Sequence, residues 1–75
     1  MSSSDLRFLS KEMNISLGEV GFLYWKNETK EIQKVVANIL SEEREYEKNN
    51  DSRFNPDRRD MAEGILVELL SELKY

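Results

Sequence analysis

The chain contains neither cysteine nor histidine among its 75 residues, which restricts how so short a sequence can be held in one fold. Disulfides need cysteine, and the usual structural zinc sites need cysteine or histidine. Small scaffolds without such links depend on close helix packing or on association with another chain. Because 39% of the residues are apolar, there is enough material for one thin core. We therefore expect a single helical domain over residues 1–75 that self-associates as a homodimer.

The same absence removes most familiar catalytic chemistry. Histidine bases, thiol nucleophiles and iron–sulfur ligation are all excluded. The three glycines form no phosphate-binding loop. The acidic residues over 42–47 lie on one helical stretch and fit a solvated face better than a cation site. The loop from Asp51 would place Arg53 and Arg59 among calcium ligands and Ala62 where a glutamate is needed. We expect no enzyme activity, no catalytic residue, no cofactor and no metal site.

The net charge of −4 disfavours nonspecific attraction to nucleic acid and to anionic membranes. The longest aliphatic run, Ile65-Leu66-Val67, is far too short to span a bilayer. The first residues lack the basic and apolar regions of a secretion signal. These features favour a cytoplasmic protein that does not act at a membrane.

The spacing of apolar residues predicts an all-α fold, a small three- to four-helix bundle with short N-terminal helices followed by two longer amphipathic helices. We expect a flexible N-terminus over residues 1–4, with Ser4 as the cap of the first helix. The clearest helix start lies at Ser16, because Ser16 and Glu19 have the spacing of a capping box. Ile15 just before the cap and Val20 four positions after it add the spacing of a hydrophobic staple.

Residues 17–48 form either one helix or two, with Asn27 or Thr29 as a possible cap of the second. A heptad-like seam of alternating three- and four-residue steps runs through this region. Its positions are Phe22, Trp25, Thr29, Ile32, Val36, Ile39, Glu43 and Tyr46. Because Glu43 stands where the seam needs an apolar residue, we expect the end of this region to project or to pack weakly.

Residues 49–55 are expected to form the loop before the last helix. Asn55 suits the cap of that helix, Pro56 its first position and Asp57 its first turn, where the helix dipole favours an acid. The helix then carries a wide apolar stripe. The stripe consists of Met61, Ala62, Ile65, Leu66, Leu69, Leu70 and Leu73.

Four bulky residues stand side by side at positions 22–25. Consecutive helical residues point in different directions, so Phe22, Leu23, Tyr24 and Trp25 cannot all face one core. The seam assigns Phe22 and Trp25 to the core and leaves Leu23 and Tyr24 as the better candidates for exposure. Since exposed apolar patches often mark interfaces and Trp and Tyr often anchor them, all four are candidate partner-binding residues.

A second candidate group surrounds the start of the last helix. Arg53, Phe54, Arg58 and Arg59 could meet an acidic partner there, because a helix N-terminus already favours anions. The competing interpretation is local: Arg59 pairs with Glu63 one turn on, and Phe54 fills the core.

The segment LRFLSKEMNISLGEVGFL, residues 6–23, resembles a helix-turn-helix unit. Met13, Asn14 and Ile15 would form the turn, and Ser16 would open the second helix. The resemblance implies a DNA-binding transcriptional regulator whose second helix enters the major groove. The outward positions of this helix, however, offer none of the Arg, Lys, Asn or Gln side chains that read base edges best. Those positions are Leu17, Gly18, Glu19, Gly21 and Phe22.

These observations favour a small acidic, non-enzymatic helical protein that acts by binding another protein, as a regulator, an inhibitor or an assembly subunit. The alternative is a helix-turn-helix DNA-binding transcriptional regulator, although the net charge makes nucleic acid a less favoured partner.

Overall fold

The computed structural model describes residues 1–72, and side chains as far as residue 71, so Leu73 of the expected stripe lies outside the described residues. The elements are α1 (Ser3–Met13), α2 (Leu17–Trp25), α3 (Lys30–Lys48) and α4 (Pro56–Glu72). This part of the chain contains no strand, which confirms the all-α helical bundle. It also contains no helix with the length and apolar character needed to cross a bilayer.

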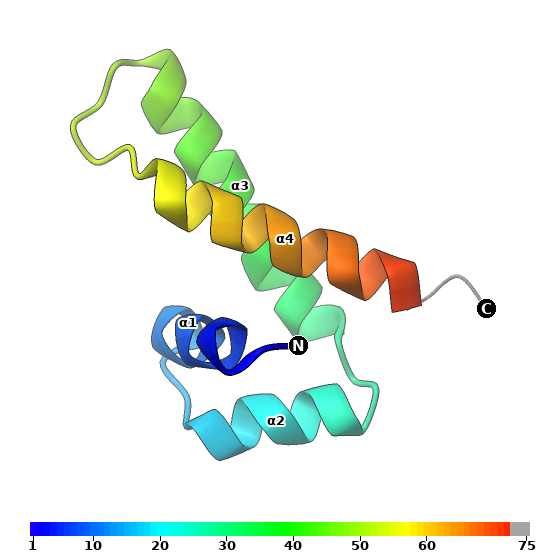
Figure 1. Cartoon of the computed structure of the whole chain (residues 1–75). Coiled ribbons are helices and arrows are strands. Elements are labelled where there is room, and N and C mark those ends of the chain that lie inside the picture. Colours follow the sequence, from blue (N-terminus) through cyan, green and yellow to red (C-terminus); the bar gives the residue numbers. More distant parts are fainter. Residues whose placement is uncertain (73–75) are drawn as a thin grey trace.

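The four helices form two connected pairs (Figure 1). Helices α3 and α4 pack along each other as the longer pair, and α1 contacts α2, α3 and α4. Among the described helices, only α1 has its backbone close to that of α2. Helix α2 lies at the opposite end of the molecule from the α3–α4 loop (Figure 1).

One small core joins the helices. Helices α1 and α2 contribute one fully buried residue each, Leu9 and Val20. The remaining buried apolar residues come in threes from α3 and α4. They are Ile32, Val36, Ile39, Ala62, Ile65 and Leu69. The core is therefore built mainly by the longer pair, and α2 is joined to it through α1.

Side-chain caps start three of the helices. The Ser2 hydroxyl accepts from the Asp5 amide at 3.2 Å, and the Asp5 carboxylate accepts in return from the Ser2 amide, which makes a full capping box. The cap of α1 is thus Ser2 rather than Ser4, and residues 3 and 4, expected in a flexible terminus, belong to the helix. The Ser16 hydroxyl accepts from the Glu19 amide at 3.1 Å, as predicted.

The start of α4 also agrees with the sequence. The Asn55 side-chain oxygen accepts from the amides of Asp57 and Arg58, both at 3.1 Å, and Pro56 is the first helical residue. Residues 49–55 form the connection between α3 and α4, as expected.

Three asparagines end the first three helices. Asn14, Asn27 and Asn50 have φ values of 55°, 59° and 52°, in the left-handed region that asparagine tolerates better than other side chains. After each, the next amide donates back to the carbonyl five residues earlier, for example Glu28 to Leu23 at 2.9 Å. This is the geometry of a Schellman motif. Residues 17–48 are therefore two helices, because Asn27 turns the chain between them.

The predicted seam is wrong at its first two positions, Phe22 and Trp25, but it continues as a buried stripe as far as Glu43. The turn at Asn27 breaks the continuous phase that would have placed Phe22 and Trp25 with Ile32, and both aromatic residues are exposed. Glu43, in contrast, keeps its seam position and is 1% exposed. The end of α3 is packed rather than projecting, because the buried Glu43 carboxylate accepts hydrogen bonds from Arg58 and from the Asn55 amide.

Candidate functional site

Helix α2 has an inner face that contacts the rest of the molecule. Val20 is fully buried, and Leu23 and Tyr24 are half-buried and packed against the core. These positions follow the three- and four-residue spacing of one helical stripe. The prediction that Leu23 and Tyr24 are the exposed members of the aromatic run is therefore wrong, since α1 lies against their side of the helix.

The opposite side of α2, which we call the α2 outer face, is apolar and uncovered in the described chain. It consists of Leu17, Gly18, Gly21, Phe22 and Trp25. Trp25 is 87% exposed, Phe22 is 57% exposed and Leu17 is about half exposed. A helix that is apolar on every side is normally buried on every side. Here the described chain buries only the inner face of α2, so the α2 outer face is the part of this helix that the fold leaves unused.

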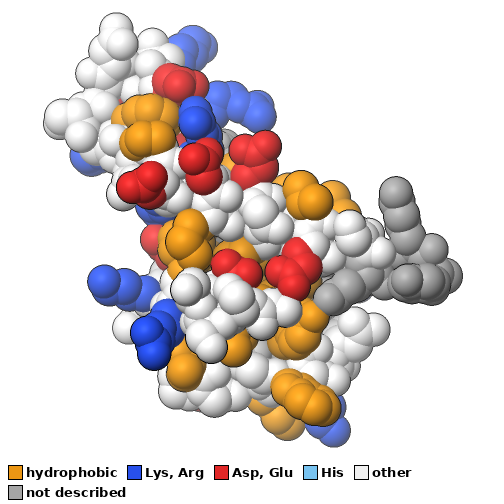
Figure 2. Space-filling model, in the orientation of Figure 1, with side chains coloured by type: hydrophobic (Ala, Val, Ile, Leu, Met, Phe, Trp, Pro, Cys, Tyr) orange, Lys and Arg blue, Asp and Glu red, His pale blue; other side chains and the backbone are white. Residues whose placement is uncertain are grey.

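Charged residues border one edge of the α2 outer face. Glu19 lies near its start and Lys26 follows its end, and the Lys26 ammonium lies 5.7 Å from the centre of the Phe22 ring. In Figure 2, hydrophobic side chains lie along the lower edge of the molecule, where Figure 1 places α2, with a basic side chain beside them. The helix is fixed at both ends, by the Ser16 cap and the Asn27 turn, so this face is held in place before any partner arrives.

The second candidate group does not adjoin the first. Arg53 and Phe54 belong to the α3–α4 loop, at the far end of the molecule from α2 (Figure 1). Arg53 pairs with Asp51 at 2.7 Å and lies over the Tyr46 ring, 4.6 Å from its centre. Its hydrogen bonds lower the pKa of the Asp51 carboxyl to about 2. Half-buried Phe54 lies under the Arg59 guanidinium, 5.4 Å from the ring centre, and is not a member of the core.

Arg59 also makes ion pairs, but not the expected one. Its guanidinium lies 3.3 Å from the Glu47 carboxylate on α3 and 3.5 Å from that of its neighbour Asp60. No ion pair with Glu63 is present among the described side chains. The predicted local pairing at this helix start is real, although its partners differ.

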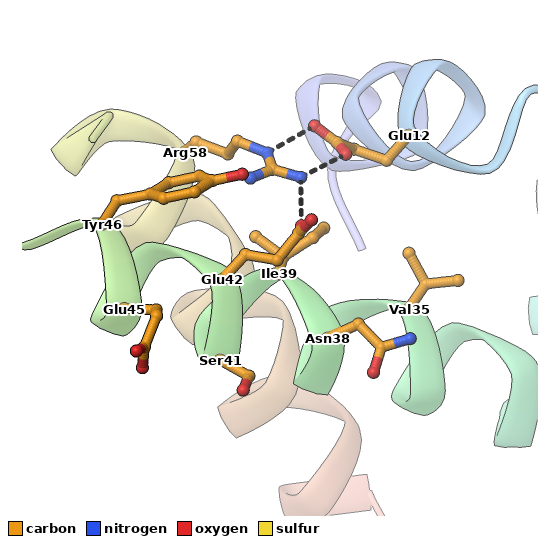
Figure 3. Close-up of a pocket in the computed structure, with 9 residues that line it drawn as sticks. All are labelled: Glu12, Val35, Asn38, Ile39, Ser41, Glu42, Glu45, Tyr46 and Arg58. Carbon is orange, nitrogen blue, oxygen red and sulfur yellow. Dashed lines mark hydrogen bonds and ion pairs between the residues drawn. The ribbon is translucent and has the colours of Figure 1, made fainter. Parts of the chain in front are cut away.

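Arg58 points into the molecule and joins three helices. Its guanidinium donates two hydrogen bonds to Glu12 of α1, both at 2.9 Å, and one to Glu42 of α3 at 3.1 Å (Figure 3). A third nitrogen donates to the buried carboxylate of Glu43 at 2.6 Å. The other oxygen of Glu43 accepts from the Asn55 amide at 2.7 Å. Because its donors are engaged inside the fold, Arg58 is a structural residue rather than a contact for a partner.

The electrostatics of this Arg58 cluster follow from its geometry. The hydrogen bonds from Arg58 hold the pKa of the Glu12 carboxyl below its ordinary value, against the opposing effect of partial burial. The hydrogen bonds to Glu12, Glu43 and Glu42 raise the pKa of Arg58, so it is charged at every accessible pH. The open pocket beside the cluster is lined by Glu12, Arg58, Glu42 and other residues of α3 (Figure 3). In the described part of the chain, no three acidic side chains are placed to hold a metal ion.

The sequence pattern does not predict the Arg58 cluster, although it places Glu43 at a seam position. A charge at a seam position of an amphipathic helix requires a buried partner. Arg58, in the first turn of the neighbouring helix, is such a partner once α3 and α4 are known to pack against each other. The contact between α3 and α4 is a property of the tertiary structure, whereas the sequence pattern indicates only that a buried charge needs a partner.

The chain matches no protein-family model, no curated protein and no solved structure in the comparisons with known proteins. The α2 outer face and the Arg58 cluster are therefore the features of this chain that bear on its function.

Proposed function

We propose that the protein is a small non-enzymatic binding protein, a regulator, inhibitor or assembly subunit, that contacts another protein through the α2 outer face. The single observation that carries this proposal is the 87% exposure of Trp25 on a helix that is capped at both ends. Tryptophan is the residue most enriched among interface anchors. Its position on a rigid helix also lowers the ordering cost of binding.

Three further features support a protein partner. The exposed apolar residues Leu17, Phe22 and Trp25 share one face rather than being scattered. The core does not use them, because Val20, Leu23 and Tyr24 supply the contact of α2 with the fold. The acidic side chains of the Arg58 cluster hydrogen-bond to one arginine, so they act in the fold and not as a catalytic pair.

The helix-turn-helix alternative has one feature in its favour and one against it. Helices α1 and α2 pack together across a short turn with Asn14 in the left-handed conformation, as the resemblance implies. The face that would enter the groove, however, carries Phe22, Trp25 and Glu19, and Lys26 is the only base at its border. We expect no shift of a labelled DNA duplex at low salt, where phosphate contacts are strongest. A salt-dependent shift that Lys26→Ala weakens would favour the DNA-binding alternative.

Photo-crosslinking tests the proposed function directly. A benzophenone amino acid is placed at position 25 in one variant and at position 48 in another, where Lys48 is exposed on α3 at the other end of the molecule. Both variants are irradiated in the cells that make the protein, and the adducts are identified by mass. We expect protein adducts from position 25 and none from position 48. Absence of adducts from position 25, or equal labelling from both positions, would contradict the proposal.

A further inference from the structure

The α2 outer face is complementary to itself. We propose that its partner is a second copy of this chain, bound with the two α2 helices antiparallel about a two-fold axis that passes between positions 21 and 22. This inference rests on the proposed function, because it names the occupant of the same face. An interface with two-fold symmetry uses one patch twice, so each contact on that patch must suit its own symmetry partner.

The shape of the face meets this condition. In the antiparallel arrangement, position 25 of one copy lies opposite position 18 of the other, so the exposed indole of Trp25 lies over Gly18 of the second copy. The same contact recurs on the other side of the axis. Phe22 lies next to the axis and meets Phe22 of the second copy, a placement that suits offset ring stacking. A large residue thus faces a residue with no side chain at both ends of the interface.

The fold of one copy does not explain these glycines. A Cβ atom built on Gly21 meets no atom within 4 Å, and one built on Gly18 meets only the Ser16 hydroxyl oxygen at 3.9 Å, an ordinary contact. Neither glycine has a positive φ. Glycine inside a helix is less stable than alanine, so both positions weaken α2 without improving the packing of the described chain. Glycine at both positions would allow the backbone of a second helix to approach α2 closely.

The charges select the antiparallel direction. Glu19 and Lys26 lie on the same edge of α2, seven positions apart, which is two helical turns. A two-fold axis keeps this edge on the same side and reverses the helix, so Glu19 of each copy lies beside Lys26 of the other. A parallel pair would have its two-fold axis along the helices and would put this edge of the two copies on opposite sides of the interface, so Glu19 and Lys26 would not meet across it. Edge charges choose helix orientation in this way in coiled coils.

The size of the face predicts a weak dimer. A fully exposed aromatic side chain presents about 150–250 Å². With the exposures of Trp25 and Phe22, and with Leu17 beside them, each copy offers roughly 400 Å² of apolar surface. Two copies then bury about 800 Å², below the standard size for stable complexes and within the range of transient ones. We therefore expect a weak, reversible dimer.

Sedimentation of the purified full chain from low micromolar to several hundred micromolar tests self-association. We expect reversible dimerisation that Trp25→Ala weakens at least about tenfold, in line with the loss of a central interface anchor. A chain that stays monomeric at the highest concentration overturns the inference. So does a dimer that Trp25→Ala leaves unchanged.

Charge reversal tests the antiparallel arrangement. Glu19→Lys alone places two lysines together at both contacts, and Lys26→Glu alone places two glutamates together, so each variant by itself should associate less than the original chain at low salt. An equimolar mixture of the two restores opposite charges at both contacts, and we expect a mixed dimer. A mixture that remains monomeric while the unaltered chain dimerises overturns the proposed arrangement.

Glycine substitution separates interface effects from folding effects. Gly18→Ala should raise the melting temperature of the monomer yet weaken the dimer, because its Cβ fits the chain but meets the incoming Trp25 of the second copy. Gly64→Ala on α4 is the matched control, since a Cβ there meets nothing within 4 Å and lies outside the α2 outer face. It should raise the melting temperature and leave the dimer unchanged. If Gly18→Ala behaves like Gly64→Ala, the close helix contact is wrong.

The crosslinking experiment distinguishes failure of this inference from failure of the proposed function. An adduct from position 25 with twice the mass of the chain supports both. An adduct with a different protein, together with a monomeric purified chain, keeps the proposed function and overturns the second copy as the occupant. No adduct and no dimer would overturn both.

Discussion

Replacing Arg58 should destabilise the protein far more than replacing its neighbour Arg59, although the two are adjacent arginines at the start of one helix. Arg58 makes four hydrogen bonds to carboxylates of α1 and α3 and is 22% exposed. Arg59 makes two longer ion pairs with well-exposed partners. Methionine keeps much of the length of each side chain and removes the charge, so Arg58→Met and Arg59→Met form a matched pair.

The expected magnitude follows from the burial of each partner. Arg58→Met leaves the Glu43 carboxylate, which is 1% exposed, with the Asn55 amide as its one remaining hydrogen-bond donor. Removing one partner of a buried ion pair costs about 3–5 kcal/mol, and the lower end applies because the open pocket admits water to Arg58. The partly exposed pair with Glu12 adds about 1 kcal/mol, and the half-exposed Glu42 adds less than that. The sum is about 4–5 kcal/mol for Arg58→Met, against less than about 1 kcal/mol for Arg59→Met.

Such a loss is large for a chain of this length, whose total stability is expected to be about 4–11 kcal/mol. It corresponds to a fall of about 16–40 °C in melting temperature, because each kcal/mol shifts a domain of this size by about 4–8 °C. Thermal and urea unfolding followed by circular dichroism measures both variants. If Arg58→Met costs no more than Arg59→Met, the buried cluster does not exist as described.

A double substitution checks that the effect comes from the ion pair itself. Glu43→Met combined with Arg58→Met leaves no buried carboxylate without its cation, so it should cost clearly less than the sum of the two single changes. Strict additivity would show that Glu43 and Arg58 do not act on each other. The reasoning about an uncompensated buried charge would then be wrong, whatever the size of the single effects.

Three further predictions follow from the same geometry. Arg58 lowers the folded-state pKa of Glu12 below its ordinary 4.5, so this carboxylate stabilises the fold above that pH and loses its contribution as the pH falls through the folded-state pKa. The melting temperature should therefore drop less on acidification in Glu12→Gln than in the original chain. An equal drop in the two proteins would contradict this prediction. Tyr24→Ala should cost about 2–4 kcal/mol of stability, since the half-buried ring packs against the core. Trp25→Ala should change the unfolding free energy of the monomer by less than about 0.5 kcal/mol, because its side chain is exposed. The reverse order would favour the sequence-based assignment, in which Trp25 lies in the core and Tyr24 is exposed. Asn55→Ala should cost about 1 kcal/mol, because it removes the cap of α4, and unfolding in urea without a change in slope would confirm a local effect.

The features that the sequence predicted correctly are those set by neighbouring residues. The cap at Ser16 and the start of α4 at Asn55 and Pro56 depend on a side chain meeting an amide two or three positions away, and both agree with the structure. The loop over 49–55 was recognisable for the same reason. The break at Asn27 was left open, because an asparagine can either cap a new helix or end the previous one in the left-handed conformation, and here it does the latter.

The features that could not be predicted depend on which element packs against which. Helix α2 is apolar around its circumference, so no periodicity marks one side as the inside. The contact with α1 makes Val20, Leu23 and Tyr24 the inner stripe and leaves Phe22 and Trp25 outside. The burial of Glu43 likewise depends on the approach of Arg58 from α4. In both cases the residue types were noted, but the face on which they lie is decided by tertiary contacts.

The α2 outer face and the Arg58 cluster lie on different helices, so changes in one should have little effect on the other. The backbone of α2 lies close only to that of α1 among the described helices, and α1 is tied to α3 and α4 by its core packing and by the bonds between Glu12 and Arg58. The α2 outer face contributes little to the stability of the monomer, and the Arg58 cluster lies on other helices. Substitutions at Trp25 and at Arg58 should therefore affect association and folding independently. If the protein binds through the α2 outer face, substitutions on that face can change binding without loss of the fold, because the buried core and the Arg58 cluster determine the free energy of unfolding.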